Sequence, residues 1–196
     1  MVAAHPETIH RWTYDQFMAI AKSGLFKDGP HVELIDGVIT DKMGQEFVHK
    51  YSLGTLLSAL QVVFGSERFF YSQGTYRLSA KDAPEPDVIV FKGTYSDYRT
   101  GDPAIGEVLL IVEVANTSVA DDLTRKRAMY ARAGIPEYWI VDVNRRGVWV
   151  LREPRSHEAT WEQESFLPEG EAILPLHAPE GAKPIPISRF LAAPGA

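Results

Sequence analysis

The apolar run LLIVEV, residues 109–114, constrains the fold more than any other stretch of this sequence. Its leucines, isoleucine and valines leave no polar face, which is typical of a strand that is covered on both sides of a sheet. Glu113 nevertheless stands inside the run. Because an isolated buried carboxylate costs on the order of several kcal/mol, Glu113 is expected to reach solvent, to form a structural ion pair or to bind a cation.

The remaining pattern predicts a mixed sheet flanked by a few helices. Helices are expected over residues 13–22 with Thr13 as the cap, over about 45–64, and from a Ser118 capping box to about Ala133. The fold class is therefore α/β or α+β, in a single domain over residues 1–196. Strands are expected over HVELIDGVIT (31–40, a hairpin turning at Asp36-Gly37), FFYSQ (69–73), TYRLS (75–79), APEPDVIVF (83–91), GEVLLIVEVA (106–115), IPEYWIVDV (135–143), GVWVLRE (147–153) and ATWEQESF (159–166).

Composition narrows the classes of function. The chain has no cysteine, which excludes a disulfide framework, a zinc–thiolate site and a cysteine nucleophile. It shows no signal-peptide pattern and no apolar run of roughly 20 residues, so we expect a cytoplasmic protein with no membrane partner. The net charge of −6 disfavours a general nucleic-acid binder, but a cluster of basic residues over 125–132, followed by Arg145 and Arg146, leaves a local basic patch open.

Two further charged residues belong with Glu113. Asp87 stands directly before the strand VIVF and after two prolines, where a carboxylate is either held rigidly or simply starts the strand from a turn. At about 100° per residue, Lys126 falls between Leu123 and Tyr130 on the apolar stripe of the third helix. Its ammonium is thus expected to face the sheet, unless the side chain extends along the edge of the stripe to solvent.

These three residues together predict a specific chemistry. Two carboxylates from adjacent strands, Asp87 and Glu113, could hold Mg²⁺ or Mn²⁺ by oxygen ligands. A lysine beside them, Lys126, could orient a water molecule or stabilise charge on a phosphate, and the metal could activate the attacking water.

The segments that carry these residues resemble a known family. PEPDVIVF and LLIVEVANTSVADDLTRKRAMYARAGIPEYWIVD, together with RWTYDQF and ELIDG, are similar to the Uma-type endonuclease family of the restriction-endonuclease-like, PD-(D/E)XK superfamily. The resemblance runs from about Arg11 to Leu151 and implies a restriction-endonuclease-like fold, in which a mixed central sheet is flanked by helices. It also implies Mg²⁺ or Mn²⁺ as cofactor and endonuclease activity.

The resemblance assigns roles residue by residue. Asp87 and Glu113 match the two metal-binding carboxylates. The superfamily's lysine two residues after the glutamate is absent, since Ala115 stands there, and Lys126 on the following helix takes its place. Glu33 matches an upstream acidic residue that could complete the metal or water shell, although it could equally be a surface charge of the hairpin. His49 matches a family histidine and is a candidate proton shuttle, although its helix face also suits a core histidine.

The leading hypothesis is a metal-dependent endonuclease that hydrolyses DNA as a homodimer, with a catalytic set of Glu33, His49, Asp87, Glu113 and Lys126. One alternative is a non-catalytic binding protein on the same fold, in which the charged residues form a structural network. The other is a phosphodiesterase acting on RNA or on small phosphate esters. Loops such as KGTYSDYRTGDPAIG, residues 92–106, would carry any sequence specificity.

Overall fold

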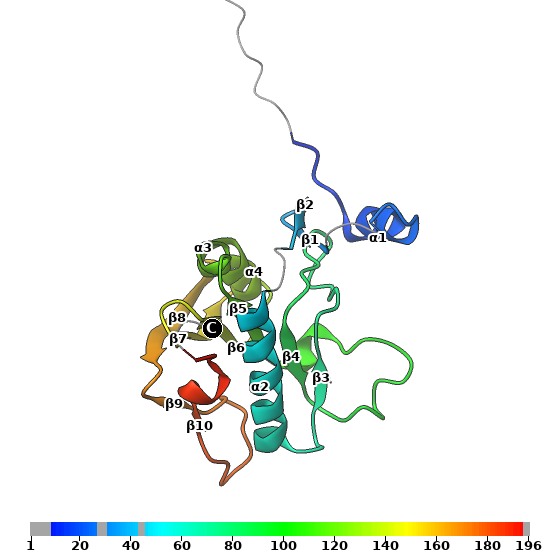
Figure 1. The fold of residues 1–196 in the computed structure, drawn as a ribbon. Coiled ribbons are helices and arrows are strands. Elements are labelled where there is room, and N and C mark those ends of the chain that lie inside the picture. Colours follow the sequence, from blue (N-terminus) through cyan, green and yellow to red (C-terminus); the bar gives the residue numbers. More distant parts are fainter. Residues whose placement is uncertain (1–8, 27–30, 43–45, 194–196) are drawn as a thin grey trace, which may run out of the picture.

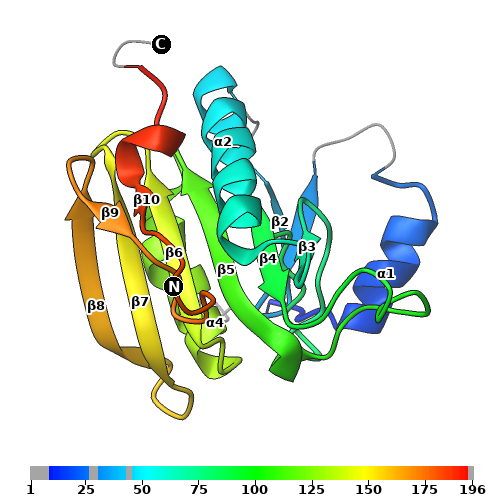
Figure 2. The ribbon, with the colours of Figure 1, turned by 90° about the horizontal axis from the view of Figure 1, so that it is seen from below.

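The computed structural model describes residues 9–26, 31–42 and 46–193 and is built around one six-stranded mixed sheet (Figures 1 and 2). The strand order is β3-β4-β5-β6-β7-β8, in which β5 and β6 run parallel and every other neighbouring pair is antiparallel. This arrangement confirms the predicted mixed central sheet. The strands are β3 (Phe69–Tyr71), β4 (Val88–Phe91), β5 (Val108–Ala115), β6 (Glu137–Asp142), β7 (Gly147–Arg155) and β8 (Thr160–Pro168).

Helical segments cover both faces of this sheet. The long helix α2 (Phe47–Phe64) lies across one face with the C-terminal 3-10 turn η3 (Ile187–Phe190), and both belong to one apolar cluster with inward residues of β4 and β5 (Figure 2). The opposite face packs against the helical segment made of α3 (Val119–Asp121), the π-type turn η2 (Asp122–Lys126) and α4 (Arg127–Arg132). Every position of β5 is therefore buried, as expected for an inner strand covered twice.

The N-terminal part forms a smaller layer beside β4. Helix α1 (Tyr14–Lys22) begins with the predicted Thr13 cap, which forms a full capping box with Gln16. The hairpin of β1 (Val32–Ile35) and β2 (Val38–Asp41) turns at Asp36 and Gly37, both of which have positive φ. Leu34 joins the hairpin to the segment before β4 through paired backbone hydrogen bonds with Ala83. The hairpin is thereby held next to the entrance of β4.

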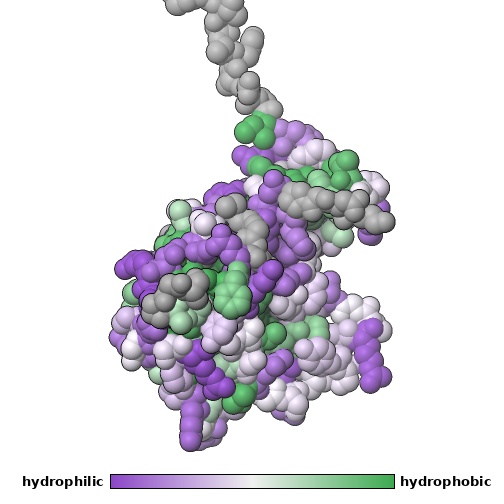
Figure 3. All heavy atoms as spheres, viewed as in Figure 1, coloured by the Kyte–Doolittle hydropathy of each residue, from purple (hydrophilic) through white to green (hydrophobic). Residues whose placement is uncertain are grey.

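Short elements complete the fold. The 3-10 turn η1 (Ile105–Glu107) leads into β5, and the two-residue strands β9 (Ala172–Ile173) and β10 (Ile185–Pro186) pair near the C-terminus. In the view of Figure 3, apolar side chains gather over the N-terminal layer at the top, and the body below is a mixture of hydrophilic and intermediate side chains with smaller apolar areas. No helix in the described part of the chain is long and apolar enough to cross a membrane.

Two local predictions are wrong. The segment TYRLS is a loop, because Tyr76 and Leu78 donate their N–H groups to carbonyls of residues 84 and 82 in a closed turn. Pro84 and Pro86 have no N–H with which a regular ladder could continue. Ser118 caps no backbone N–H, because its hydroxyl donates instead to the Asp122 carboxylate. The predicted start of the long helix at Gln45 lies outside the described residues, which show it from Phe47 onward.

Candidate active site

Asp87 lies directly before β4, and Glu113 lies in the neighbouring strand β5. The antiparallel register of β4 and β5 pairs Val88 with Val112, and continuing it by one residue places Asp87 opposite Glu113. Directly opposed residues of an antiparallel pair share a face of the sheet, and two like charges there repel. Both carboxylates are nearly fully buried, with exposures of 1% and 2%. This arrangement therefore requires positive partners.

The Asp87 carboxylate is held by three groups. Its Oδ2 accepts a hydrogen bond from the Val114 N–H at 2.8 Å, and its Oδ1 accepts one from Lys42 Nζ at 3.0 Å. His49 Nε2 lies 3.4 Å from the same Oδ1 without hydrogen-bond geometry. Burial alone would raise the pKa of Asp87, but the neighbouring His49, the charge of Lys42 and the Val114 N–H together lower it to about 2. Asp87 is thus ionised at neutral pH.

The Glu113 carboxylate faces the helical segment on the other side of the cleft. Its Oε1 accepts hydrogen bonds from Lys126 Nζ at 3.0 Å and from the Tyr130 hydroxyl at 2.8 Å. Burial raises the pKa of Glu113 to about 8, with Lys126 opposing the shift and the charges of Asp87 and Asp122 adding to it. A proton or a cation is therefore favoured at this carboxylate.

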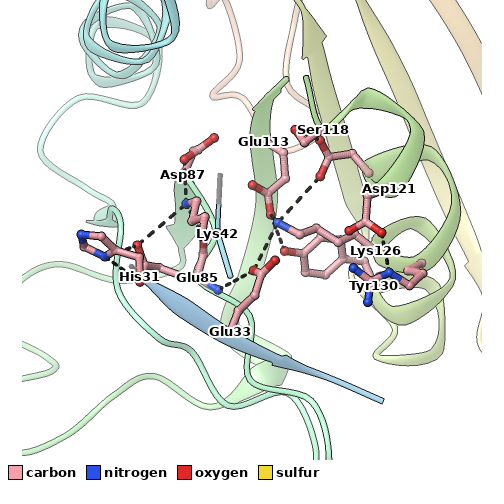
Figure 4. A network of polar contacts seen from close by, with 12 residues as sticks. His31, Glu33, Lys42, Glu85, Asp87, Glu113, Ser118, Asp121, Lys126 and Tyr130 are labelled. Carbon is pink, nitrogen blue, oxygen red and sulfur yellow. Dashed lines mark hydrogen bonds and ion pairs between the residues drawn. The ribbon is translucent and has the colours of Figure 1, made fainter. Parts of the chain in front are cut away.

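Lys126 is the positive centre of a second group of acids. Its Nζ lies 3.0 Å from Glu113 Oε1, 3.3 Å from Glu33 Oε2 and 3.7 Å from Asp122 Oδ1 (Figure 4). Burial alone would lower the pKa of Lys126, but the charges of these acids raise it well above its usual value. The inward direction predicted from helical periodicity is confirmed, and the side chain is 5% exposed. It projects from the end of the π-type turn η2, a local widening that often accompanies functional sites.

These groups line one cleft with a volume of about 380 Å³. All five of the residues that the sequence singled out, Glu33, His49, Asp87, Glu113 and Lys126, are part of its wall. They come from four regions of the chain: the β1–β2 hairpin, the first turn of α2, the adjoining strands β4 and β5, and the end of η2. Asp87 and Glu113 are brought to one cleft by the pairing of β4 with β5, whereas the other residues reach it through tertiary packing.

A divalent cation suits the donors of this cleft. Within the described residues, no three acidic or histidine side chains already form a metal-binding group. Ammonium groups instead lie against the two opposed carboxylates, Lys42 on Asp87 and Lys126 on Glu113. Mg²⁺ is commonly held by only one or two carboxylates, with water and substrate phosphate completing its shell. Asp87 and Glu113 supply such a pair of hard oxygen ligands on one face of the sheet.

Unpartnered polar atoms around the cleft support the same fit. His49 Nε2, Glu85 Oε1 and Asp122 Oδ1 are buried and have no hydrogen-bond partner among the described residues. Each of the three has a charged neighbour, at 3.4 Å (Asp87 for His49), 3.2 Å (His31 for Glu85) and 3.7 Å (Lys126 for Asp122), and each keeps an open hydrogen-bonding position that a water or an ion can use. Burial also raises the pKa of Asp122 to about 6, against the opposing charge of Lys126.

Sequence reasoning missed three charged residues at the cleft: Lys42, which lines it, and Glu85 and Asp122, which lie near its two lysines. Lys42 follows the second hairpin strand, Glu85 stands two residues before Asp87, and Asp122 lies one helical turn before Lys126. The i to i+4 spacing of Asp122 and Lys126 could have indicated their ion pair. For Lys42 the sequence holds no comparable indication, because its contact with Asp87 depends on how the hairpin packs against β4.

The basic cluster does not form a free patch. Each of its arginines on the helical segment pairs with an acid, and the two that follow β6 are also engaged. The contacts are Arg125 with Asp121, Arg127 with Glu164, Arg132 with Asp36 and Arg146 with Glu169, while Arg145 stacks over Trp149 and Phe166. Of these, Arg125 lines the cleft.

Known proteins resemble this chain in sequence and in fold. The profile of the Uma2 family, whose description is "Putative restriction endonuclease", matches residues 14–188. Among solved structures, a protein from Anabaena variabilis, described as "a putative nuclease belonging to DUF820", superposes with a TM-score of 0.68. The two chains are 18% identical, and the similarity covers 91% of this chain and 96% of the other. This likeness bears on the fold and confirms the predicted nuclease-like architecture. No curated protein matches the sequence.

Proposed function

This chain belongs to the Uma2 family, and from that premise we propose that it is a metal-dependent endonuclease that hydrolyses phosphodiester bonds in DNA. The family resemblance expected from the sequence is confirmed, and it supports a nuclease. The proposal goes beyond family membership in four respects: the metal, the DNA substrate, a homodimeric assembly and the roles of individual residues.

One observation carries the proposal. Asp87, directly before β4, and Glu113 of β5 line one cleft, and the buried ammonium of Lys126 contacts Glu113 there. A pair of buried carboxylates beside a lysine is a costly arrangement for stability alone, because each charge must be desolvated. It is the donor set that metal-assisted phosphodiester hydrolysis needs.

The proposed roles follow from the contacts. Asp87 and Glu113 would hold Mg²⁺ or Mn²⁺, which when bound supplies Lewis-acid stabilisation of the phosphate and a more acidic water. Lys126 would donate to the attacking water or to a phosphate oxygen, and Glu33 would keep its ammonium charged and aimed into the cleft. His49 Nε2, which lacks a hydrogen-bond partner among the described residues, would take up or release a proton at the edge of the site.

We choose DNA over RNA and small phosphodiesters as the substrate because the description of the family profile names a restriction endonuclease. A homodimer suits the cutting of two antiparallel strands, since a two-fold assembly presents two equivalent sites.

The test uses supercoiled plasmid DNA with Mg²⁺ or Mn²⁺. We expect nicking or linearisation by the wild type and by Glu171→Gln, an exposed carboxylate outside the cleft, and none by Asp87→Asn or Glu113→Gln. Nicking that survives unchanged in both cleft variants would contradict the assignment. Parallel reactions on RNA and on small phosphodiesters distinguish DNA from the alternative substrates.

A second candidate function has one observation in its favour. The cleft carboxylates of Glu33, Asp87 and Glu113 already face a cation, Lys42 or Lys126, as in a structural ion network, which suits a non-catalytic binding protein on the same fold. This candidate predicts no binding of Mg²⁺ or Mn²⁺ in calorimetry. Binding that is lost in Asp87→Asn would exclude it.

A further inference from the structure

Lys42 occupies the position of a cation at Asp87. Its ammonium donates to Asp87 Oδ1 at 3.0 Å and to the Glu85 carbonyl oxygen at 2.7 Å, and it lies 3.9 Å from Glu85 Oε1 (Figure 4). The three oxygens belong to a carboxylate, a backbone carbonyl and a second carboxylate, which are the oxygen ligands that Mg²⁺ and Ca²⁺ use in proteins. Lys42 thus donates to two of the oxygens that a divalent ion would need and lies near the third.

More polar groups surround the ammonium of Lys42 than it forms hydrogen bonds with. Its side chain is only 10% exposed, and burial alone would lower its pKa, but the charges of Glu113 and Asp87 raise it, so the ammonium stays charged. Nearby, Glu85 Oε1 and His49 Nε2 are buried without hydrogen-bond partners among the residues described, and their charged neighbours are His31 Nδ1 at 3.2 Å and Asp87 Oδ1 at 3.4 Å. The lysine therefore neutralises Asp87 but leaves neighbouring polar atoms unsatisfied.

The two cleft lysines differ in how firmly they are held. Lys126 lies between three carboxylates, those of Glu33, Glu113 and Asp122. Lys42 forms its close contacts with one carboxylate and one uncharged carbonyl. It also extends from the end of a two-stranded hairpin, whereas Lys126 is fixed by a helical segment packed on the sheet. Of the two ammonium groups, that of Lys42 is the easier to displace.

We propose that Lys42 is a resident counter-ion that holds Asp87 in the metal-free protein and must leave it when a divalent cation binds, so that it sets the metal concentration at which the site fills. This inference rests on the proposed function, because it takes Asp87 as a metal ligand. The lysine balances the charge of Asp87 before the metal arrives, and it competes with the metal for the same oxygen.

Calorimetric titration with Mn²⁺ tests the competition. We expect Lys42→Met to bind Mn²⁺ about tenfold more tightly than the wild type, because a charge-assisted hydrogen bond no longer has to be broken. Lys50→Met is the matched control, since Lys50 is an exposed lysine of α2 next to His49 and its loss removes the same charge. At physiological salt we expect that control to change the affinity less than about twofold, because exposed charges are screened.

The outcomes separate this inference from the proposed function. If the wild type binds no Mn²⁺, the proposed function fails. If the wild type binds Mn²⁺ and Lys42→Met binds no more tightly than Lys50→Met, Lys42 is no competitor and this inference alone is overturned. Weaker binding by Lys42→Met would likewise overturn it, because the lysine would then be supporting the site.

A measurement on the wild type covers the case in which Lys42→Met does not fold. The side-chain Hε and Cε signals of Lys42 are followed by NMR during titration with diamagnetic Mg²⁺. We expect them to move toward the positions of exposed lysines as the site fills, while the signals of Lys50 stay in place. Lys42 signals that do not move up to Mg²⁺ saturation would contradict displacement.

Discussion

Glu113 and Glu137 lie on adjacent parallel strands, and their surroundings are opposite in kind. Both are buried in apolar strands, with exposures of 2% and 0%. Both Glu137 oxygens are satisfied by fixed donors: Oε1 accepts from Trp139 Nε1 at 2.9 Å and from Arg152 Nε at 2.8 Å, and Oε2 accepts from the Leu176 N–H at 2.7 Å. Glu113 instead shares a cleft wall with other acids and faces Asp87.

The difference shows that a buried carboxylate can either serve the fold, with all its hydrogen bonds formed, or remain able to bind a proton or a cation. Glu137 is paired directly across the sheet with Arg152, and its second oxygen anchors a backbone N–H of the C-terminal segment. Its charge is balanced and its hydrogen bonds are complete, so it contributes to the fold. Glu113 is one of several acids around Lys126, and burial raises its pKa to about 8, with the charges of Asp87 and Asp122 adding to the shift. A site of this kind can accept a proton or a metal.

The largest expected effect separates the two glutamates by activity. If the proposed function holds, Glu113→Gln is expected to lower the rate of DNA cleavage by about a hundredfold or more, because it removes a proposed metal ligand. Glu137→Gln is expected to keep the cleavage rate per folded molecule within about twofold. The measurement is initial nicking of plasmid DNA at saturating Mg²⁺, with the folded fraction determined by circular dichroism. Equal losses in the two variants would remove the distinction.

The second effect reverses the order and concerns stability. Glu137→Gln is expected to lower the free energy of unfolding by about 3 kcal/mol, because Arg152 and the Leu176 N–H lose a charged partner. Glu113→Gln is expected to lower the free energy of unfolding by less than about 1 kcal/mol at pH 7. The pKa of Glu113 is near 8, so its side chain is already mostly protonated and neutral at this pH. Urea denaturation without metal measures both. A Glu113 variant that loses as much as the Glu137 variant would place both residues in the structural class.

A pH series sharpens the comparison through Glu113. In the folded, metal-free protein its pKa is raised from 4.5 to about 8, so between these values the folded state holds a proton that the unfolded state has lost. The stabilisation from this group is full below pH 4.5 and is lost as the pH rises through about 8. Asp87, whose pKa is lowered from 3.8 to about 2, contributes a constant amount across this window.

We therefore expect the free energy of unfolding of the metal-free wild type to fall by about 1 kcal/mol per pH unit between pH 6 and 8. The slope should be shallower in Glu113→Gln and unchanged in Glu137→Gln. Urea titrations at half-unit intervals provide the measurement. An identical slope in wild type and Glu113→Gln would show that another group titrates.

Local pattern was enough to predict much of this site. The apolar runs predicted the strands of the sheet, and helical spacing predicted that Lys126 points toward the sheet. Both predictions were possible because they depend only on residues close in sequence. Lys42 could not be found in this way, because its contact joins a hairpin to a strand 45 residues later. The structural role of Glu137 could not be predicted locally either, because one of its carboxylate oxygens accepts its hydrogen bond from the backbone N–H of residue 176. Ser118 was misjudged because a nearby carboxylate competes for its hydroxyl.

The smallest expected effect compares two neighbouring cations, Lys126 and Arg127. Arg127 pairs with Glu164 of β8, with side chains that are 24% and 35% exposed, so water and salt screen the pair. Arg127→Met is expected to cost about 0.5 kcal/mol of unfolding free energy, decreasing further in 0.5 M salt. Lys126→Met removes the cation from three buried acids and should cost several times more, with little response to salt. Urea denaturation at two salt concentrations measures both free energies of unfolding. Equal costs would contradict the expectation that the buried cation of Lys126 contributes more to stability than the exposed ion pair of Arg127.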